Sequence, residues 1–241
     1  MKKSSKIGEV YNFSDGSFAT IISECKDYRV KIKFSDGTIQ ENVSYYKFRV
    51  GNIKNRNKKI HFGVGFIGYG SYIGCVSDLR YRTWRSMLER CYGNRKSKKS
   101  YKNCTVDDKW HNFQNFAKWF DENYINGFHL DKDILIKGNK VYSEKTCCFV
   151  PVKINGCFVL KKLNRGNFPL GMCMDAGKLK CVINKNGKSI NLGRYINEKE
   201  AFEVYKKEKE SYIKELANEY KGIITDECYS ALLNWKIEIN D

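Results

Sequence analysis

Strict alternation of basic and apolar residues over positions 29–34 is the pattern of a half-buried β-strand. The Asp36-Gly37 pair that follows is a strong signal for a hairpin turn. Similar patterns occur on either side, and the predicted strands cover residues 18–23, 29–34 and 38–43. Several short strands in such a short stretch of chain predict a small β-barrel at the N-terminus.

Helical spacing begins near residue 80. Apolar side chains recur on one helix face in two segments, formed by Trp84, Met87, Leu88 and Cys91 and by Phe113, Phe116, Ala117 and Phe120. Asp78 is placed to cap the first of these helices. We expect the aromatic side chains of both helices to pack in a core rather than to stack on nucleic-acid bases.

Residues 128–155 predict a strand, a turn, a short strand and then a helical piece. Asp131 would end the first strand, and Gly138-Asn139 would form the turn. Asn155 falls at the start of the helical piece, just after Pro151.

The C-terminal segment predicts three short strands followed by a helix. The strands are expected at residues 170–174, 178–184 and 189–195, with turns at residues 175–177 and 185–187. The second turn contains Asn-Gly, the dipeptide that best fits a tight hairpin. Asn197 is a predicted helix cap, with Glu200 three residues later. A short terminal helix is expected over residues 226–235.

These elements together predict an α+β protein with three parts. The first is the small β-barrel of residues 1–60, and the second comprises residues 61–160, with helices followed by a ββα hairpin. The third comprises residues 161–241, a three-stranded sheet with a packing helix.

Charge narrows the range of partners. The chain of 241 residues carries 44 basic and 27 acidic residues, a formal net charge of +17. Such a surplus favours a polyanion as partner. No stretch approaches the roughly 18 consecutive apolar residues of a membrane span, and no apolar run follows the first lysines as in a secretory signal. We therefore expect no membrane association and a cytoplasmic location.

The ten cysteines include no Cys-x-x-Cys pair. A zinc site usually has at least one such close pair of ligands. Most of these cysteines are therefore expected to be small buried side chains in a reducing compartment. A structural zinc ion held by Cys91, Cys104 and either Cys147 or Cys148 is the alternative.

The central segment resembles the HNH nuclease superfamily, and within it endonucleases carried by bacteriophages. The resemblance covers roughly residues 80–157. It rests on a chain of motifs, namely Leu130-Asp131-Lys132-Asp133, Gly138-Asn139, Tyr142-Ser143, Thr146-Cys147, Val150-Pro151 and Asn155, with the upstream residues Trp84, Arg90-Cys91-Tyr92 and Trp110. It implies a ββα element that holds one divalent cation, such as Mg²⁺, and cleaves or nicks DNA.

By the same resemblance, Asp131 and Asn155 would bind the metal and Asn139 would orient the hairpin. Lys132 occupies the position of the general-base histidine, and a lysine with an ordinary pKa of about 10.4 does not accept a proton at neutral pH. His129 could replace it as base or ligand, because a strand would place it on the same face as Asp131 and Asp133. The catalytic candidates are therefore His129, Lys132 and Asn139.

Charge is distributed unevenly in the C-terminal part. Residues 161–196 contain eight basic residues and one acidic residue, whereas residues 197–221 contain six basic and seven acidic residues. A basic sheet is therefore expected to face a polyanion, with the helix toward water. A sheet of this kind can enter the major groove of DNA. The predicted DNA contacts are Arg165, Lys178, Lys180, Lys185, Lys188 and Arg194.

This segment resembles the Apetala/ethylene-responsive DNA-binding domain, which also occurs in phage HNH homing endonucleases. The resemblance rests on Leu170-Gly171, Lys180, Asn191-Leu192-Gly193-Arg194-Tyr195, Glu200-Ala201-Phe202 and Tyr205. It implies binding of double-stranded DNA. The hypothesis from sequence is thus a phage DNA-binding protein with metal-dependent nuclease activity, and the resemblance implies that it acts in the cytoplasm of a bacterial host cell. The alternatives are a catalytically silent DNA-binding regulator and a basic inhibitor or RNA-binding protein.

Overall fold

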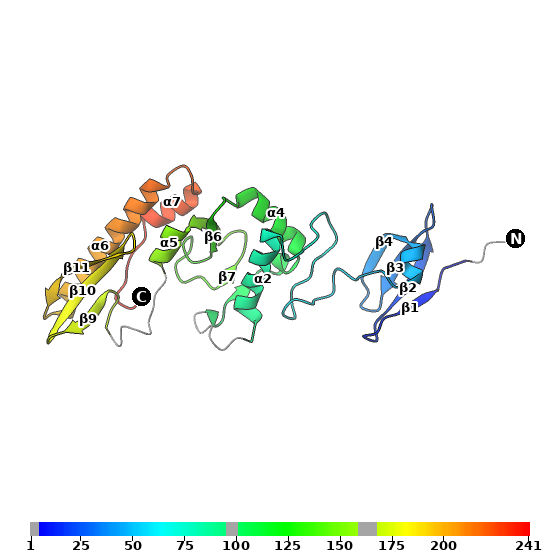
Figure 1. The fold of residues 1–241 in the computed structure, drawn as a ribbon, viewed down its shortest axis with the longest axis horizontal. Coiled ribbons are helices and arrows are strands. Elements are labelled where there is room, and N and C mark those ends of the chain that lie inside the picture. The colour runs from blue at the N-terminus through cyan, green and yellow to red at the C-terminus, as the bar shows by residue number, and fades with distance from the viewer. Residues whose placement is uncertain (1–4, 95–100, 159–167) are drawn as a thin grey trace. The chain divides into compact units, whose positions relative to one another are not determined.

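The computed structural model describes residues 5–94, 101–158 and 168–241 (Figure 1). The fold is mixed α+β with several small sheets, as predicted. The chain forms two compact units, one of residues 1–88 with 108–117 and the other of residues 89–107 with 118–241. The division into three domains remains a prediction.

The N-terminal strands form an open antiparallel sheet in the order β1-β2-β3-β4. Its elements are β1 (Val10–Asn12), β2 (Phe18–Glu24), β3 (Arg29–Phe34) and β4 (Ile39–Ser44), followed by helix α1 (Tyr45–Arg49). The prediction of a small β-barrel is wrong, because no sheet closes on itself within the described residues. The buried face of the sheet packs against Phe48 of α1 and against Ile53, so apolar side chains cover this face without further strand pairing.

The two helices predicted in the central segment are present, and each of them runs across the boundary between the two units. They are α2 (Leu79–Tyr92) and α4 (Phe113–Asn123). A short helix that was not predicted, α3 (Asp108–His111), precedes α4. Asp78 caps α2, since its Oδ1 accepts a hydrogen bond from the backbone N–H of Arg80 at 2.9 Å. Trp84, Phe113 and Phe116 are fully buried, which confirms that these rings belong to a core.

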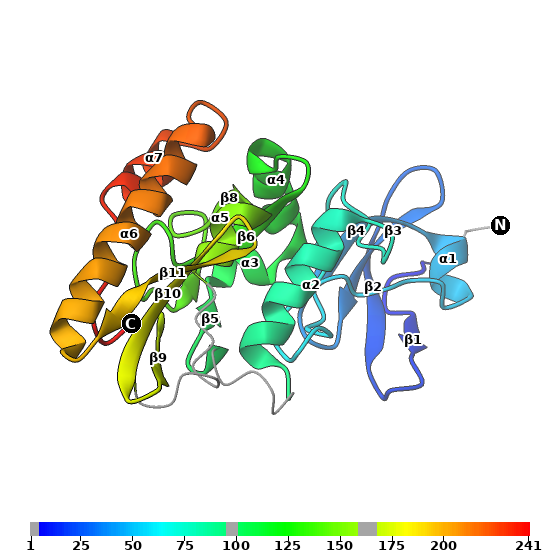
Figure 2. The same cartoon turned by 60° about the vertical axis from the view of Figure 1, so that its left-hand side comes forward.

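The second unit begins with two pairs of short strands. Strand β5 (Thr105–Val106) lies parallel to β7 (Val141–Tyr142), and β6 (Phe128–Asp131) lies antiparallel to β8 (Cys148–Pro151). Helix α5 (Val152–Cys157) follows β8 directly, and Figure 2 shows it close to β6. Asp131 and Asn155 are therefore carried by neighbouring elements, the end of β6 and the middle of α5.

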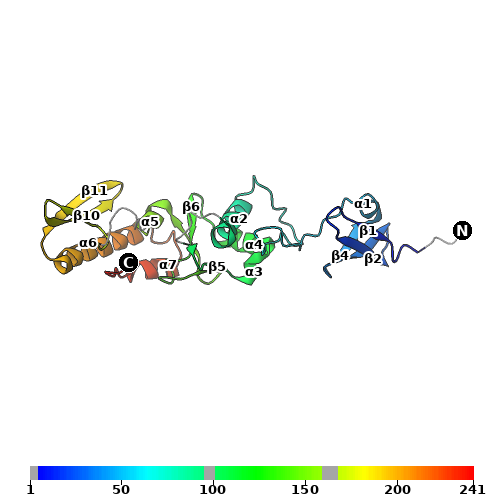
Figure 3. The same ribbon diagram turned by 90° about the horizontal axis from the view of Figure 1, so that it is seen from below.

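The C-terminal segment forms a three-stranded antiparallel sheet in the order β11-β10-β9. Its elements are β9 (Met172–Asp175), β10 (Lys178–Lys185), β11 (Lys188–Tyr195), α6 (Glu198–Glu219) and α7 (Asp226–Leu233). The turn between β10 and β11 has positive φ angles at both Asn186 and Gly187, as a tight hairpin requires. Asn197 caps α6 by accepting hydrogen bonds from Lys199 and Glu200. Figure 3 shows the strands running along one side of α6.

One hydrophobic core joins the β6–β8 hairpin to the C-terminal elements. Val150 and Ile154 pack in the same cluster as Ile183 of the sheet, Leu216 of α6 and Leu232 of α7. The hairpin is therefore not a free-standing module but is supported by the C-terminal helices.

The cysteines are all unpaired. Five are buried, two are partly buried, and Cys25, Cys75 and Cys173 are exposed, so the expectation that most are buried is only partly right. The Sγ atoms of Cys148 and Cys228 lie 3.7 Å apart in the core. In the part of the chain that the structure describes, no three His, Cys, Asp or Glu side chains gather as a metal site. The zinc alternative thus finds no support there.

Candidate functional site

Asp131 ends β6 and turns the chain out of the hairpin. Its Oδ1 accepts hydrogen bonds from the backbone N–H of Asp133 at 2.7 Å and of Ile134 at 2.9 Å. Burial raises the pKa of Asp131, and these two N–H groups act against that rise. The carboxylate is thus held by one oxygen, while no described residue donates a hydrogen bond to Oδ2.

Lys132 is almost completely buried, with 4% of its surface exposed. Its Nζ donates to Asp133 Oδ1 at 2.7 Å and to the carbonyl oxygen of Asn139 at 2.9 Å. The amine also lies 5.8 Å from the centre of the Tyr142 ring. An ammonium group engaged in this way stabilises the loop between the two strands, and its geometry is that of a structural side chain rather than a base.

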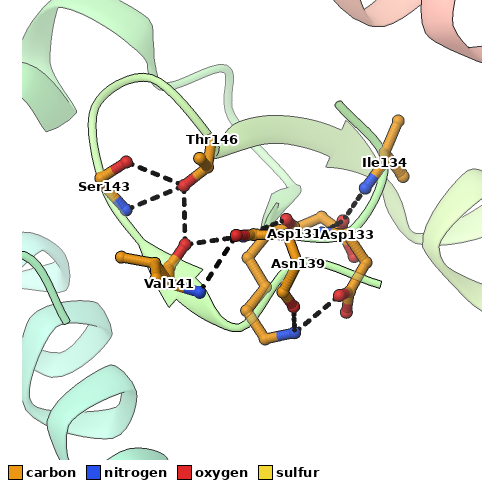
Figure 4. Close-up of polar contacts among 8 residues, drawn as sticks. Asp131, Asp133, Ile134, Asn139, Val141, Ser143 and Thr146 are labelled. Carbon is orange, nitrogen blue, oxygen red and sulfur yellow. Dashed lines mark hydrogen bonds and ion pairs between the residues drawn. The ribbon is translucent and has the colours of Figure 1, made fainter. Parts of the chain in front are cut away.

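Asn139 closes the loop between Asp131 and β7 (Figure 4). Its Nδ2 donates to the carbonyl oxygens of Lys132 at 2.8 Å and Val141 at 2.7 Å, and its Oδ1 accepts from the N–H of Val141 at 3.1 Å. The hydroxyl of Thr146 donates to the same Val141 carbonyl at 2.7 Å. Asn139 thereby fixes the backbone of the residue next to Asp131.

His129 does not join Asp131 and Asp133 in a row of ligands. It is exposed on β6, opposite Val150 of β8. Strand β6 ends at Asp131, so the alternation of side chains that would align position 133 stops there. Asp133 instead pairs with Lys132. The predicted row of three is therefore wrong, while the role of His129 as a base stays a prediction.

Asn155 lies half-buried on α5, which packs against β6. Among the described residues its side chain has no hydrogen-bond partner. Its amide oxygen and Oδ2 of Asp131 are both oxygen ligands of the kind that Mg²⁺ prefers, and Mg²⁺ commonly retains several waters and binds few protein groups. These donor types suit a divalent cation, but among the described residues no three His, Cys, Asp or Glu side chains gather around Asp131 to complete a metal site.

A second group of predicted residues lies on the C-terminal sheet. Leu179, Cys181 and Ile183 of β10 are buried, so the alternating positions between them face away from α6. Lys180 on this outer face lies directly opposite Arg194 of β11. Lys178 is exposed at the start of β10.

Asp175 is the only acidic residue of positions 161–196. It pairs with Arg194 at 2.7 Å. In the described residues, neither Lys178 nor Lys180 has an ion-pair partner. The outer face therefore keeps uncompensated positive charge.

The other predicted DNA contacts are placed differently. Lys185 turns toward α6, where its Nζ lies 2.5 Å from Glu208 and 3.9 Å from Glu215. The positive charge of Lys185 is therefore compensated by carboxylates of α6 rather than presented to a partner. Lys188 is exposed beside the turn between β10 and β11, and Arg165 lies outside the described residues.

Arg90 is a neighbour of this site to which the sequence analysis assigned no role. Its guanidinium group is hydrogen-bonded to the Tyr142 side chain and lies 5.6 Å from the centre of the Tyr101 ring. Burial raises the pKa of Tyr142, although Arg90 acts against the rise. Tyr142 thereby connects Arg90 to Lys132. No spacing in the sequence reveals this contact, because the partners are distant along the chain.

Comparison with protein-family models, curated proteins and solved structures finds no match for this chain. The site is therefore interpreted from its own geometry and charge. Within residues 5–94, 101–158 and 168–241, no helix is both long and apolar enough to cross a membrane.

Proposed function

We propose that this protein binds double-stranded DNA through the outer face of the β9–β11 sheet. The observation that carries the proposal is the positive charge left on this face, where Asp175 pairs with Arg194 while Lys178 and Lys180 have no ion-pair partner among the described residues. Lys180 lies directly opposite Arg194, and one carboxylate does not neutralise this group of like charges. A phosphate backbone supplies further negative charge, and the formal net charge of +17 favours the same kind of partner.

The shape of the element supports this proposal as well. Strands can enter the major groove of B-form DNA, whereas the major groove of an RNA duplex is too deep and narrow for side chains to read. Lysines provide affinity that depends on salt, while an arginine can recognise guanine. We therefore infer binding that is mainly electrostatic, with Arg194 as the residue best suited to sequence selection.

Replacing Lys180 and Arg194 together by glutamine is expected to weaken DNA binding at least about tenfold at physiological salt. The logarithm of the binding constant should also depend less steeply on salt, by about two units of slope. Electrophoretic mobility shift at several salt concentrations measures both effects.

The matched control is the double substitution Lys207→Gln and Lys214→Gln, which removes two exposed charges from α6. Equal losses in the two double variants would mean that only total charge matters. Tighter binding of structured RNA than of duplex DNA would favour the RNA-binding alternative instead.

A second candidate function is metal-dependent cleavage or nicking of the bound DNA at the β6–β8–α5 element. It is favoured by Asn139, whose side chain holds the carbonyl oxygen of Lys132 and both backbone groups of Val141. That is the orienting role implied by the resemblance to HNH nucleases. Mg²⁺ or a similar ion would polarise the scissile phosphate and lower the pKa of a bound water.

The residues of the chain have distinct roles in this candidate function. Asp131 and Asn155 would hold the cation, and Asn139 would keep the loop in position. Lys132 serves as a structural clamp, because its amine already donates two hydrogen bonds. His129 is exposed and can receive a proton from an attacking water, which makes it the proposed base.

The pH dependence of cleavage should reflect the environment of Asp131. Because burial raises the pKa of its carboxyl group, cation binding and cleavage are expected to fail at a higher pH than for an ordinary aspartate. The folded state then binds the proton more tightly than the unfolded state, so protonation of Asp131 favours folding as the pH falls.

Nicking rates and unfolding free energies measured between pH 4 and 8, for the wild type and for Asp131→Asn, test this expectation. The wild type should gain stability relative to the variant as the pH falls, while its nicking rate decreases. If the nicking rate of the wild type decreased with pH only as the protein unfolds, protonation of Asp131 would not control cleavage, and its assignment as cation ligand would be contradicted.

A further inference from the structure

A pocket of about 500 Å³ lies between α5, α6 and the hairpin of β10 and β11. Helix α6 contributes Tyr205, Lys209 and Tyr212 to its wall, and the hairpin contributes Asn186. All these elements belong to the second unit. None of Lys178, Lys180 and Arg194 lines it, so it is distinct from the group of residues proposed to bind DNA.

Lys209 is the unusual residue of this pocket. Only 9% of its surface is exposed, yet among the described residues its amine has neither a hydrogen bond nor an ion pair. Other lysines near it are paired: Lys153 lies 2.7 Å from Glu219, and Lys185 lies 2.5 Å from Glu208. A buried ammonium group without a partner is costly, so the position favours an anion that comes from outside the chain.

The composition of the pocket wall also favours an anion. Its residues include two lysines and two asparagines but no aspartate or glutamate. The hydroxyl of Tyr212 accepts a hydrogen bond from the N–H of Asn186 at 2.9 Å and donates to Asn186 Oδ1 at 3.1 Å, which fixes this side of the wall. Burial lowers the pKa of Lys209, and a bound anion would reverse that shift.

We propose that this pocket binds a small phosphorylated molecule about the size of a mononucleotide, with its phosphate group on Lys209. The volume lies within the range of small-molecule sites, roughly 300–1,000 Å³. A lysine ammonium is a compact point charge and binds phosphate well. The aromatic rings of Tyr205 and Tyr212 provide an apolar surface beside the charge. The phosphate belongs either to a free nucleotide or to the 5′ end of a nucleic-acid strand.

Binding of dTMP to the full chain, measured by isothermal titration calorimetry and thermal shift, tests the proposal. Thymidine, which lacks the phosphate, and succinate, a carboxylate dianion, serve as comparison ligands. We expect dTMP to raise the melting temperature of the wild type, with little effect of the other two. Lys209→Met should lower the affinity for dTMP at least about tenfold, since it removes a hydrogen bond to a charged group.

Two further variants keep the test independent of folding. Lys207→Met removes an exposed charge two residues away on α6 and should bind dTMP as the wild type does. Gly156 lines the pocket from α5, and a Cβ added there would meet no atom within 4 Å, so Gly156→Leu is expected to obstruct the pocket and abolish binding without unfolding the protein. Lys209→Met itself is expected to melt no lower than the wild type, because its amine has no partner to lose.

The two possible sources of the phosphate, a free nucleotide and a strand end, are distinguished with a trinucleotide that carries a 5′-phosphate and the same trinucleotide without it. Tighter binding of the phosphorylated trinucleotide than of dTMP assigns the pocket to a strand end, and the reverse order assigns it to a free nucleotide. Equal binding of dTMP by the wild type, Lys209→Met and Gly156→Leu would overturn the proposal. So would thymidine or succinate binding as tightly as dTMP, or no binding of dTMP and the phosphorylated trinucleotide at millimolar concentration.

Discussion

Asp131→Asn is expected to abolish metal-dependent nicking of supercoiled plasmid while leaving DNA binding intact. Asparagine keeps an Oδ1 acceptor for the N–H groups of Asp133 and Ile134, so the turn after β6 should persist. It removes the negative charge that would attract a divalent cation. We expect the nicking rate to fall at least about 100-fold, in line with the several kcal/mol that a catalytic metal ion supplies.

Two variants separate the roles of the neighbouring side chains. Lys132→Met keeps the buried stem but removes the ammonium group, and it should retain nicking wherever the protein remains folded, because the amine is a structural clamp. His129→Gln should reduce nicking by about 10²- to 10⁴-fold, the usual contribution of a general base. If Lys132→Met reduced the nicking rate more than His129→Gln did, Lys132 would be the base instead.

The plasmid assay includes Mg²⁺, Mn²⁺ and EDTA, with mobility shift as a separate measure of binding. Plasmid that the wild type retards but does not cut, in either metal, would remove the catalytic role. The protein would then be a DNA-binding protein whose hairpin serves as scaffold. Nicking by Asp131→Asn at the wild-type rate would place the cation elsewhere.

Local patterns predicted many of the elements correctly. Strand β3 has the predicted bounds, since alternating basic and apolar residues determine which face is buried. The hairpin at Asn186-Gly187 was also predictable, because few residues tolerate two successive positive φ angles. The cap at Asn197 follows from a side chain that can accept hydrogen bonds from the next backbone N–H groups. Each of these signals is contained within a few residues.

The errors concern contacts between distant residues. The barrel was wrong because the pattern of strands does not reveal that Phe48 and Ile53 cover the buried face of the sheet. The clamp formed by Lys132 depends on the carbonyl of Asn139, which the turn brings back to it. Similarly, the unpaired amine of Lys209 follows from the packing of α6 beside the pocket and has no signature in the sequence.

Leu216→Ala is expected to destabilise the second unit by about 3–4 kcal/mol, because it deletes a buried side chain and leaves a cavity. Leu216 is only 2% exposed and packs in the core that also contains Val150, Ile154 and Ile183. Since this core joins the hairpin to the C-terminal sheet, the two should lose protection together. Hydrogen exchange measured by mass spectrometry on peptides from residues 128–157 and 172–195 tests this coupling.

The control is Ile21→Ala, a similar deletion in the separate core of the N-terminal sheet. It should increase exchange in residues 18–44 and leave the hairpin of β6 and β8 unchanged. If Leu216→Ala exposed only the C-terminal sheet and left residues 128–157 protected, the hairpin would be independent of α6. In the expected case, α6 supports both the sheet proposed to bind DNA and the β6–β8 hairpin, so one destabilising substitution in the shared core would impair the proposed binding and cleavage together.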